Sequence, residues 1–555
     1  MHRTFETSAT RRRRELGGPW GFAIDPGDEG VTDGYPESFP DDADRIDVPA
    51  AWNARTDYHD YEGPAWYRRR FDLPTSGTTR IAFQGVCHEA TVWLDGDRVA
   101  DHYGGYTPFE VVTDLDAGEH ELVVRADNTR DEHSIPRPGT DWFPYGGITR
   151  EVFVESLPDR FVSDLTVEYD LDGDRADVTA SVRVRNEGEA TSAPVAFDLA
   201  GETIRREVDL DPGTTAVGFD LALDVDRWSL DDPVLYEAVA TVDGKERDEV
   251  RERVGFRTIE VTDADLLLNG DPLAFRGVNR HEDHPEWGHA QPFRIQELDL
   301  DVIEDAGLNA VRTAHYPNHP RFLDRCDERG VLVIEEIPYW QFDADRFHRG
   351  DVLERGTAML AEMIERDRTH PSIVAWSVTN ECANEEAGVY EATADLVERA
   401  RELDDRPVTL ASNNYHPDGD GVDPCLDLVD FVCANAYPGW YDDGSYANVL
   451  EGVREDQPDK PVVVSEFGAG AVYGERTRES QQWSEGFQAD FVEDAIRTFR
   501  EADYVAGFAI WQYCDTRTDP RRWETRPKTK NNKGIVDEYR RPKEAYHRVA
   551  DLLDD

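Results

Sequence analysis

Two glutamates at the ends of apolar, strand-like segments are the residues of this chain with the clearest potential for chemistry. Residues 373–378 (IVAWSV) form a short apolar run that leads into Asn380-Glu381, and a helix-like stretch follows. Further along, PVVVSEFG at 461–468 repeats the pattern and carries Glu466. Buried strands of parallel sheets have such continuous apolar runs, and barrel enzymes place their reacting groups at the carboxyl ends of these strands. A pair of such carboxylates is what cleavage of a glycosidic bond requires.

The stereochemistry of cleavage depends on the distance between the two carboxyl groups. If they lie across the mouth of one barrel, a gap of about 5–5.5 Å is expected, and this distance gives retention. Glu466 would then attack the anomeric carbon, and Glu381 would protonate the leaving oxygen and later activate water. A proton donor at neutral pH needs a raised pKa, which partial burial and the negative Glu466 would provide. Asn380 is expected to hydrogen-bond the sugar 2-OH.

The elements that position these glutamates are predicted to form a (β/α)8 barrel over residues 259–555. Apolar runs alternate there with amphipathic helical stretches, which is typical of parallel βαβ units. Eight strands are predicted, the fourth ending at Glu381 and the seventh containing Glu466; they span 273–280, 308–316, 331–338, 373–381, 408–414, 431–439, 461–468 and 505–515. Helices are expected between them, for example at 296–306, 320–329, 386–402 and 482–499.

The N-terminal part of the chain is predicted to be all-β. Residues 1–160 alternate apolar and polar residues between Gly- and Asp-rich turns, which favours a sandwich of jelly-roll type. Its loop at 140–150 (TDWFPYGGITR) is unusually aromatic, and Asp141 in it is a candidate to reach a neighbouring active site. Residues 161–258 show a second run of short strands with the turn spacing of a small immunoglobulin-like sandwich. No catalytic group is evident in this second sandwich, so we interpret it as a spacer.

Other polar and aromatic side chains also follow the predicted barrel strands, where a purely structural strand would not need them. They are His281-Glu282-Asp283, Arg312, His315, Glu335-Glu336, Asn435, Tyr437 and Trp511. His281, His284 and His289 with the two acidic residues between them resemble a metal-ligand cluster. Their spacing is not that of an HExxH site, and acidic residues are abundant everywhere in the chain. We therefore predict no metal and no other cofactor.

A lysine-rich loop follows the eighth predicted strand. Lysine is rare in this chain, yet Lys528, Lys530 and Lys533 lie close together within RPKTKNNKGIVDEYRRPK at 526–543. A solvated basic loop is the simplest interpretation. An ammonium group beside an asparagine at the barrel mouth would, however, suit an anionic substrate group such as a sugar carboxylate.

The overall composition limits the partners and the environment of the chain. The formal net charge of the 555 residues is −57, spread along the whole sequence. Such self-repulsion needs screening, which indicates a halophilic, haloarchaeal-type protein; it also argues against nucleic acid or an anionic membrane as a partner. The six cysteines show no metal or disulfide spacing, so reduced core thiols are expected. The Arg11–Arg14 run lacks a following apolar segment, no run is long enough to span a bilayer, and we expect a cytoplasmic location.

With these residues in hand, the sequence resembles glycoside hydrolase family 2, and within it the β-glucuronidases. The resemblance runs almost from end to end through GGPWGFAID (17–25), FRGVNRHED (275–283), NAVRTAHYP (309–317), DRCDERGVLVIEEIP (324–338), Asn380-Glu381, SEFG (465–468) and WSEGFQ (483–488). It implies a sugar-binding jelly roll, an immunoglobulin-like sandwich and a catalytic barrel. It also implies that Glu381 is the acid/base and Glu466 the nucleophile.

The resemblance also assigns the substrate-binding residues. NNKGI at 531–535 is similar to the Asn-x-Lys-Gly-Ile signature with which β-glucuronidases hold the C6 carboxylate, which gives that role to Asn531 and Lys533. Other matches to that pocket are Asp141, Tyr437, Tyr441 and Trp511, and His281, Arg312 and His315 complete the expected site. Two features depart from the pattern: Pro438 replaces an aromatic residue, and the placement of basic residues argues against Arg526 and Lys530 as carboxylate contacts.

The segment after the third strand narrows the choice within the family. Galactosidases of the family carry Glu-Thr-His-Gly there with a magnesium site, whereas this chain has EEIPYWQF at 335–342. The segment is also too short for the long aglycone-contacting loop of some gut bacterial glucuronidases. The sequence therefore predicts a retaining exo-β-glucuronidase. β-Galacturonidase or β-galactosidase activity is the alternative, and a non-catalytic carbohydrate-binding protein is a distant one. By analogy with the family, a homodimer or homotetramer is expected.

Overall fold

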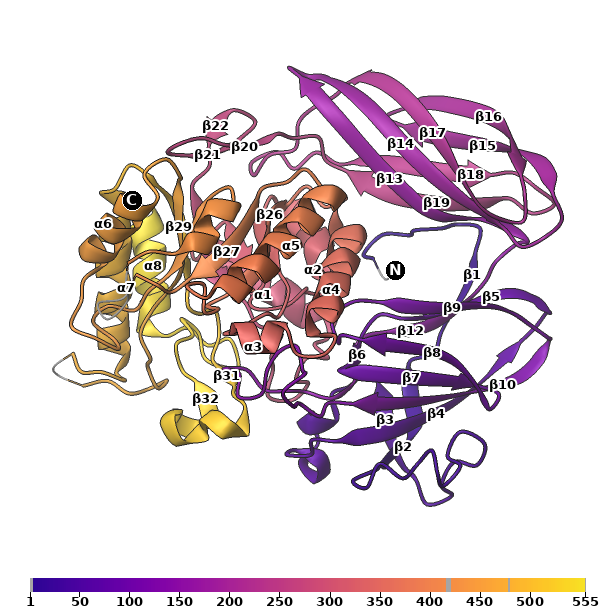
Figure 1. The fold of residues 1–555 in the computed structure, drawn as a ribbon, viewed down its shortest axis with the longest axis horizontal. Helices are drawn as coiled ribbons and strands as arrows, with labels where there is room; N and C mark the ends of the chain where they lie inside the picture. Colours follow the sequence, from indigo (N-terminus) through magenta and orange to yellow (C-terminus); the bar gives the residue numbers. More distant parts are fainter. Residues whose placement is uncertain (1–2, 416–420, 478–479, 555) are drawn as a thin grey trace.

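A computed structural model describes residues 3–415, 421–477 and 480–554 and divides the chain into three parts. In Figure 1 the N-terminal sandwich lies at the lower right, the second sandwich at the upper right, and the barrel at the left. Each part encloses a hydrophobic core of its own. The predicted combination of jelly roll, immunoglobulin-like sandwich and barrel is thus confirmed.

The first part is a jelly-roll sandwich of antiparallel strands. One sheet has the order β1-β12-β5-β9, formed by Arg12–Glu15, Val152–Ser156, Gly77–Phe83 and Phe109–Leu115. The other has the order β3-β2-β4-β10-β7-β8, formed by Asp44–Val48, Gly18–Ile24, Pro64–Leu73, Gly118–Asp127, Glu89–Leu94 and Asp97–Tyr103. A short pair joins β6 (Val86–Cys87) to β11 (Gly147–Ile148). The inward faces bury large side chains such as Trp20, Phe22 and Tyr67, because alternate residues of a strand point to the same face.

The second part is the smaller sandwich. Its sheets have the orders β13-β14-β17 (Arg160–Asp172, Arg175–Asn186, Gly213–Asp224) and β16-β15-β18-β19 (Glu202–Leu210, Thr191–Leu199, Tyr236–Val242, Asp248–Val254). Strand β14 alternates strictly between exposed and buried side chains, as expected for a strand with one face on a core. A small sheet of β20 (Ile259–Val261), β21 (Leu266–Leu268) and β22 (Asp271–Pro272) leads into the barrel.

The third part is a closed parallel barrel. Within the described residues its strands follow chain order: β23 (Phe275–Asn279), β24 (Ala310–Arg312), β25 (Leu332–Glu336), β26 (Ile373–Asn380), β27 (Val408–Ser412), β28 (Val432–Asn435), β29 (Val462–Phe467) and β30 (Val505–Ile510). Each corresponds to one predicted strand. Several end earlier than predicted, since the polar and aromatic residues at their carboxyl ends, Tyr437 and Trp511 among them, belong to the loops above the barrel.

Helices surround the barrel strands. They are α1 (Phe293–Asp305), α2 (Pro320–Arg329), α3 (Ala344–Phe347), α4 (Val352–Asp367), α5 (Ala387–Leu403), α6 (Tyr446–Asp456), α7 (Glu485–Arg500) and α8 (Glu544–Asp554). The short pair of β31 (Thr516–Arg517) and β32 (Lys530–Asn531) brackets the lysine-rich loop, which also contains the 3-10 turns Pro520–Thr525 and Pro527–Thr529. Among the described helices, none combines the length and the apolar character needed to cross a bilayer.

The jelly roll contacts the barrel through buried ion pairs and hydrogen bonds. Arg150 donates to Glu282 at 3.0 Å and to the carbonyl of Pro317 at 2.9 Å, and the Tyr145 hydroxyl donates to Asp283 at 2.9 Å. These contacts lie next to the carboxyl ends of β23 and β24, so they fix the loop that carries Asp141 beside the barrel mouth. All six cysteines are buried and free, as predicted.

Candidate active site

Glu381 lies immediately after β26 in a half-buried position. Its Oε2 accepts a hydrogen bond from Nε2 of Gln341 at 2.9 Å, and its Oε1 accepts one from Nδ2 of Asn435 at 3.2 Å. Burial and the negative charge of Glu466 raise the pKa of Glu381 to about 7, while the two amide donors lower it. A carboxyl group with this pKa is able both to donate and to accept a proton at neutral pH, which is what an acid/base catalyst must do.

Glu466 lies inside β29, and both of its oxygens have donors. Nη1 of Arg312 donates to Oε1 at 2.7 Å, and the hydroxyl of Tyr437 donates to Oε2 at 2.6 Å. Burial and the neighbouring Glu466 raise the pKa of Tyr437 well above its ordinary value, so the phenol stays protonated and remains a donor. The groups around Glu466 thus stabilise its ionised form, whereas the surroundings of Glu381 favour its protonated form.

Arg312 connects the two sides of the site. Besides Glu466, its guanidinium donates to Glu336 at 2.9 Å and to the side-chain oxygen of Asn380 at 2.6 Å. Burial lowers the pKa of Arg312, but Glu336 and Glu466 outweigh burial and raise it. The bond fixes the amide of Asn380 with its oxygen toward Arg312, and Nδ2 of Asn380 is then buried without a hydrogen-bond partner among the described residues. An N–H group in this state is available to a substrate hydroxyl.

A pocket of about 560 Å³ opens over these residues. This volume lies within the range for small-molecule sites. Its lining includes both glutamates and is completed by Asp141, His315, Trp340, Gln341, Asn413, Asn435, Ala436, Tyr437, Tyr441, Asp442, Trp511, Arg522, Thr525, Arg526 and Lys533. Of the predicted site residues, Asn380, Arg312, His281 and Asn531 contact the lining residues from behind or beside the pocket.

Lys533 lies at one end of the pocket among aromatic rings. Its ammonium group is 2.8 Å from the hydroxyl of Tyr441 and within 5.0–5.6 Å of the ring centroids of Tyr437, Trp440 and Tyr441. No carboxylate of the described residues forms an ion pair with it. Asn531 is buried nearby; its oxygen accepts the backbone N–H of Lys533 at 3.3 Å, and its Nδ2 lacks a partner within the same described ranges. An ammonium group and an amide donor are thus both available to an anion.

Asp141 reaches the pocket from the jelly roll. It forms an ion pair with Arg526, whose Nη2 lies 2.5 Å from Oδ2. Burial raises the pKa of Asp141, but Arg526 and Lys533 outweigh burial and hold it below its ordinary value, so the carboxylate is ionised. The sequence argued against Arg526 as a contact, yet the structure places it in the pocket lining. Lys530, by contrast, pairs with Glu538 and is not part of the lining.

Trp511 and two histidines form the wall behind the glutamates. The Trp511 ring stacks on His315 with centroids 5.0 Å apart, and His281 meets the edge of Trp511 at 5.5 Å. Burial, with His315 and His289 nearby, lowers the pKa of His281 well below its ordinary value, so this ring is neutral. Gly468 follows Glu466 in the chain at a point where a Cβ atom would lie 2.3 Å from the carbonyl oxygen of Trp511. Glycine is therefore required for Trp511 to approach β29.

The polar side chains after β23 have partners within the protein: His281 and His289 both contact the Tyr316 hydroxyl. Glu282 is paired with Arg150, Asp283 accepts from Tyr145, and His284 stacks on Trp287 with centroids 4.2 Å apart. In the described part of the chain the group with ligand-like spacing is a different one, Asp324, Asp327 and His370.

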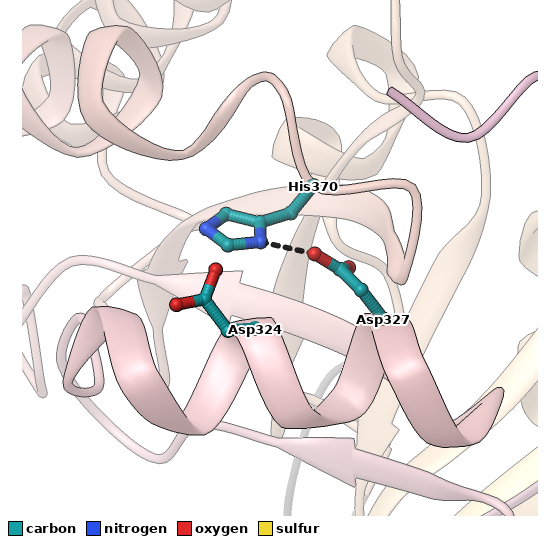
Figure 2. A group of neighbouring side chains, drawn as sticks. All are labelled: Asp324, Asp327 and His370. Atoms are coloured by element: carbon teal, nitrogen blue, oxygen red, sulfur yellow. Dashed lines mark hydrogen bonds and ion pairs between the residues drawn. The ribbon is translucent and has the colours of Figure 1, made fainter. Parts of the chain in front are cut away.

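Figure 2 shows this other group, with the two aspartates on α2 facing His370. Nδ1 of His370 lies 2.5 Å from Asp327, while its Nε2 contacts the guanidinium of Arg3. Both ring nitrogens are therefore engaged, and the cation of Arg3 takes the place a metal would need. The group lies near the start of β26, at the opposite end of the barrel from Glu381. We interpret it as the attachment point of the N-terminal segment.

Several pocket residues escaped prediction from the sequence, among them Trp340, Gln341 and Arg522. Trp340 and Gln341 lie in the loop after β25, where a backbone bridge joins Trp340 to Asn380 and the N–H of Gln341 donates to the Asn380 carbonyl at 2.8 Å. The signal was present, since an aromatic residue and an amide directly follow a strand end. Arg522 comes from a 3-10 turn far along the chain, and its sequence position gives no indication of the pocket.

Comparison with known proteins gives one consistent result. Sequence profiles of glycosyl hydrolases family 2 match residues 13–158 (sugar binding domain), 160–257 (glycosyl hydrolases family 2) and 259–553 (TIM barrel domain), which is most of the chain. A β-glucuronidase of Streptococcus agalactiae is 30% identical over 96% of this chain and 95% of its own length, and the β-glucuronidase of Sus scrofa is 28% identical over 97% and 90%.

Solved structures point to the same family. The GH2 β-galacturonidase from Eisenbergiella tayi bound to galacturonate superposes with a TM-score of 0.92 at 35% identity and covers 100% of this chain and 99% of that one. The β-glucuronidase of Ruminococcus gnavus superposes with a TM-score of 0.87 at 28% identity, with the same coverage.

Proposed function

We propose that this chain, which belongs to glycosyl hydrolase family 2, is a retaining exo-β-glucuronidase that removes β-linked glucuronic acid from the end of its substrate. Glu466 attacks the anomeric carbon and Glu381 protonates the glycosidic oxygen. In the second step Glu381, now ionised, takes a proton from the water that releases the sugar from Glu466. Because family membership makes the chain a glycoside hydrolase, the alternative of a non-catalytic carbohydrate-binding protein is set aside.

The single observation that carries this proposal is the contrast between the two glutamates of the pocket. Glu466 receives hydrogen bonds from Arg312 and Tyr437, which stabilise a carboxylate nucleophile. Glu381 is half-buried beside that negative charge, and desolvation together with the charge of Glu466 raises its pKa to about 7. Once Glu466 is esterified by the sugar, the negative charge that raised the pKa of Glu381 is gone. The pKa of Glu381 then falls, and its carboxylate form can act as the base that activates water. The predicted carboxylate gap and the retention that follows from it stay predictions.

The uronic acid assignment depends on Lys533 and Asn531. The Lys533 ammonium has no carboxylate partner in the described ranges, and a C6 carboxylate in this corner would receive it together with the free amide of Asn531. Tyr441 borders the same corner: burial raises its pKa, but Lys533 and Arg526 outweigh burial and lower it. A neutral galactoside would leave the Lys533 ammonium without an anion, which argues against β-galactosidase activity.

β-Galacturonidase activity is the second candidate. It is favoured by the likeness to the Eisenbergiella tayi enzyme, whose identity of 35% exceeds the 30% of the Streptococcus agalactiae glucuronidase. Galacturonate carries the same carboxylate and differs at C4, so Lys533 would serve both sugars equally. Asp141 and Trp511, which line the pocket, are the side chains we expect to distinguish the two C4 hydroxyl orientations.

Hydrolysis of matched 4-nitrophenyl β-glucuronide, β-galacturonide and β-galactoside tests the proposal. We expect the glucuronide to give the highest kcat/KM. Preference for the galacturonide would preserve the carboxylate contact and overturn the C4 assignment, whereas preference for the galactoside would refute the role of Lys533. NMR analysis of the first-formed anomer tests retention in the same reaction.

Replacement of Lys533 gives a sharper test of carboxylate recognition. A charge-assisted contact contributes about 1.5–3 kcal/mol, so Lys533→Ala should lower kcat/KM for uronides roughly 10- to 100-fold. The neutral galactoside should lose far less. Lys460→Ala is the matched control, since Lys460 donates to the carbonyls of Leu426 and Val429 and does not line the pocket. Equal losses on charged and neutral sugars would refute the assignment.

We further propose that the enzyme works at molar salt, on the basis of its net charge of −57. The cytoplasmic location, the homodimeric or homotetrameric state, and the absence of nucleic-acid and membrane partners stay predictions.

A further inference from the structure

Arginine side chains gather around Trp340 at the edge of the active-site pocket. The guanidinium groups of Arg137 and Arg522 lie 5.7 and 5.3 Å from the Trp340 ring centroid. Arg137 comes from the jelly roll and Arg522 from the loop after β30, so two separate parts of the chain bring cations to the same indole. Trp340 and Arg522 themselves line the pocket.

These cations lack the carboxylates that such groups normally acquire. The chain has 117 acidic and 60 basic Lys and Arg residues, so acidic partners are plentiful. Yet in the described part of the chain neither Arg137 nor Arg522 forms an ion pair; Arg137 donates to the carbonyl of Gln341 at 3.1 Å and Arg522 to that of Gly139 at 2.7 Å. Backbone carbonyls hold the two guanidiniums in place without neutralising them.

The gathered positive charge is costly in the absence of an anion. Burial, and then the positive charges of Arg346 and Arg522, lower the pKa of Arg137 below its ordinary value and outweigh Asp343, which raises it and pairs with Arg346 at 3.9 Å. Nε of Arg137 and Nη1 of Arg346 are buried and have no hydrogen-bond partner among the described residues. An anionic group bound here would relieve the repulsion and satisfy these donors.

The cluster lies on the side of the pocket that the leaving group must occupy. Trp340 is bridged to Asn380, and the next residue, Gln341, donates to Glu381 at 2.9 Å. Glu381 has to contact the glycosidic oxygen, so side chains beside it border the group that departs. The carboxylate of the cleaved sugar already has its own cation in Lys533, which lies against Tyr441.

We propose that the cluster of Arg137, Trp340 and Arg522 is a binding site for a carboxylate on the leaving group. The substrates it would take are uronides whose leaving group is itself anionic, above all a second uronic acid at the end of an acidic oligosaccharide. Trp340 would pack against the sugar or aromatic ring of that group, and the guanidiniums would hold its carboxylate. This inference rests on the proposed uronidase activity.

The test compares two aryl uronides that differ only in the charge of the leaving group. The pair is the 4-carboxyphenyl and 4-carbamoylphenyl β-glycosides of whichever uronic acid the enzyme accepts, measured at one fixed salt concentration. The wild type is expected to prefer the carboxylate, and Arg522→Gln should reduce the preference about ten-fold. Arg454→Gln is the matched control because Arg454 also lies over an aromatic ring, 4.9 Å from the Tyr504 centroid, and lies outside the pocket. It should retain the wild-type preference.

Each outcome separates this inference from the proposed function. If the wild type hydrolyses neither aryl uronide, nor the nitrophenyl glycosides, the uronidase proposal fails. If it hydrolyses both aryl uronides equally well, the leaving-group site alone is refuted. Equal losses on both substrates in Arg522→Gln would assign Arg522 to the cleaved sugar instead. A third comparison uses two disaccharides whose leaving sugar is a uronate in one and the neutral hexose in the other, and it distinguishes a sugar carboxylate from an aryl carboxylate. Preference for the uronate supports an acidic oligosaccharide as substrate. No preference refutes it.

Discussion

Removal of the hydrogen bond from Gln341 to Glu381 should move the alkaline limb of the pH–activity profile upward. The Gln341 amide donates to Oε2 of Glu381 at 2.9 Å, and an N–H donor stabilises the ionised carboxylate more than the acid. In Gln341→Leu that stabilisation is lost, so the pKa of Glu381 rises from its value of about 7. A hydrogen bond to a charged group contributes about 1.5–3 kcal/mol, and 1.36 kcal/mol corresponds to one pKa unit. Because Asn435 still donates to the other oxygen and water can enter, we expect a shift of about one pH unit.

The assay is kcat/KM for a nitrophenyl β-uronide between pH 5 and 9, since this quantity reports the pKa of the free enzyme's proton donor. Gln457→Leu is a matched control: the Gln457 amide donates to Asp427 at 3.2 Å at the end of α6, outside the pocket. Its profile should coincide with that of the wild type. An alkaline limb that stays in place or moves down in Gln341→Leu would refute the assignment of that limb to Glu381.

Three further predictions concern the glutamates and the charge of the chain. Glu466→Ala should lower turnover by about four orders of magnitude or more while leaving the circular dichroism spectrum intact, and full residual activity would refute the nucleophile assignment. Glu381→Gln should gain stability relative to the wild type as the pH rises from 5 to 8. Glu381 binds its proton more tightly when folded, with a pKa of about 7 against an ordinary 4.5, so its ionisation costs the folded state about 3 kcal/mol above pH 7. Urea unfolding at both pH values measures this, and a difference independent of pH would contradict it. Finally, the melting temperature should fall when KCl is reduced from about 2 M to 0.1 M. The Debye length then grows from a few Å to about 10 Å, so the repulsion between carboxylates is screened less. An equal melting temperature would argue against a halophilic protein.

The barrel was predictable from the sequence because its strands are buried on both faces. Runs such as 373–378 and 461–464 contain almost only apolar residues, as expected of strands in a parallel sheet covered on both faces. Strands of the second sandwich were harder to recognise. β16 (ETIRREVDL) has largely exposed side chains and a pattern dominated by charge, and such a strand shows its alternation only weakly.

The pair of glutamates proposed to react could be picked out from the sequence, whereas only part of the pocket around them could. Glu381 and Glu466 are marked by the strands that carry them, and Asp141 by the aromatic loop in which it lies. Gln341 follows the third barrel strand and could have been noticed there, whereas Arg522 is brought to the pocket by a loop whose path depends on long-range packing. Such paths leave no local pattern in the sequence, since loop residues follow no period and one arginine among many is not distinctive.

The chain is strongly acidic, yet its pocket contains cations that have no ion-pair partner in the described part of the chain. This contrast supports an anionic substrate. With a net charge of −57, the mean field of the protein repels an anionic uronide. High salt would screen that field beyond a few Å, but contacts inside a partly buried pocket are screened much less. Lys533 and Arg522 line the pocket without ion-pair partners among the described residues, so their charge remains available at short range. In a protein with so many carboxylates, we expect such cations to have carboxylate partners. Their lack of partners within the described ranges indicates that the position beside them is kept for an anion of the substrate.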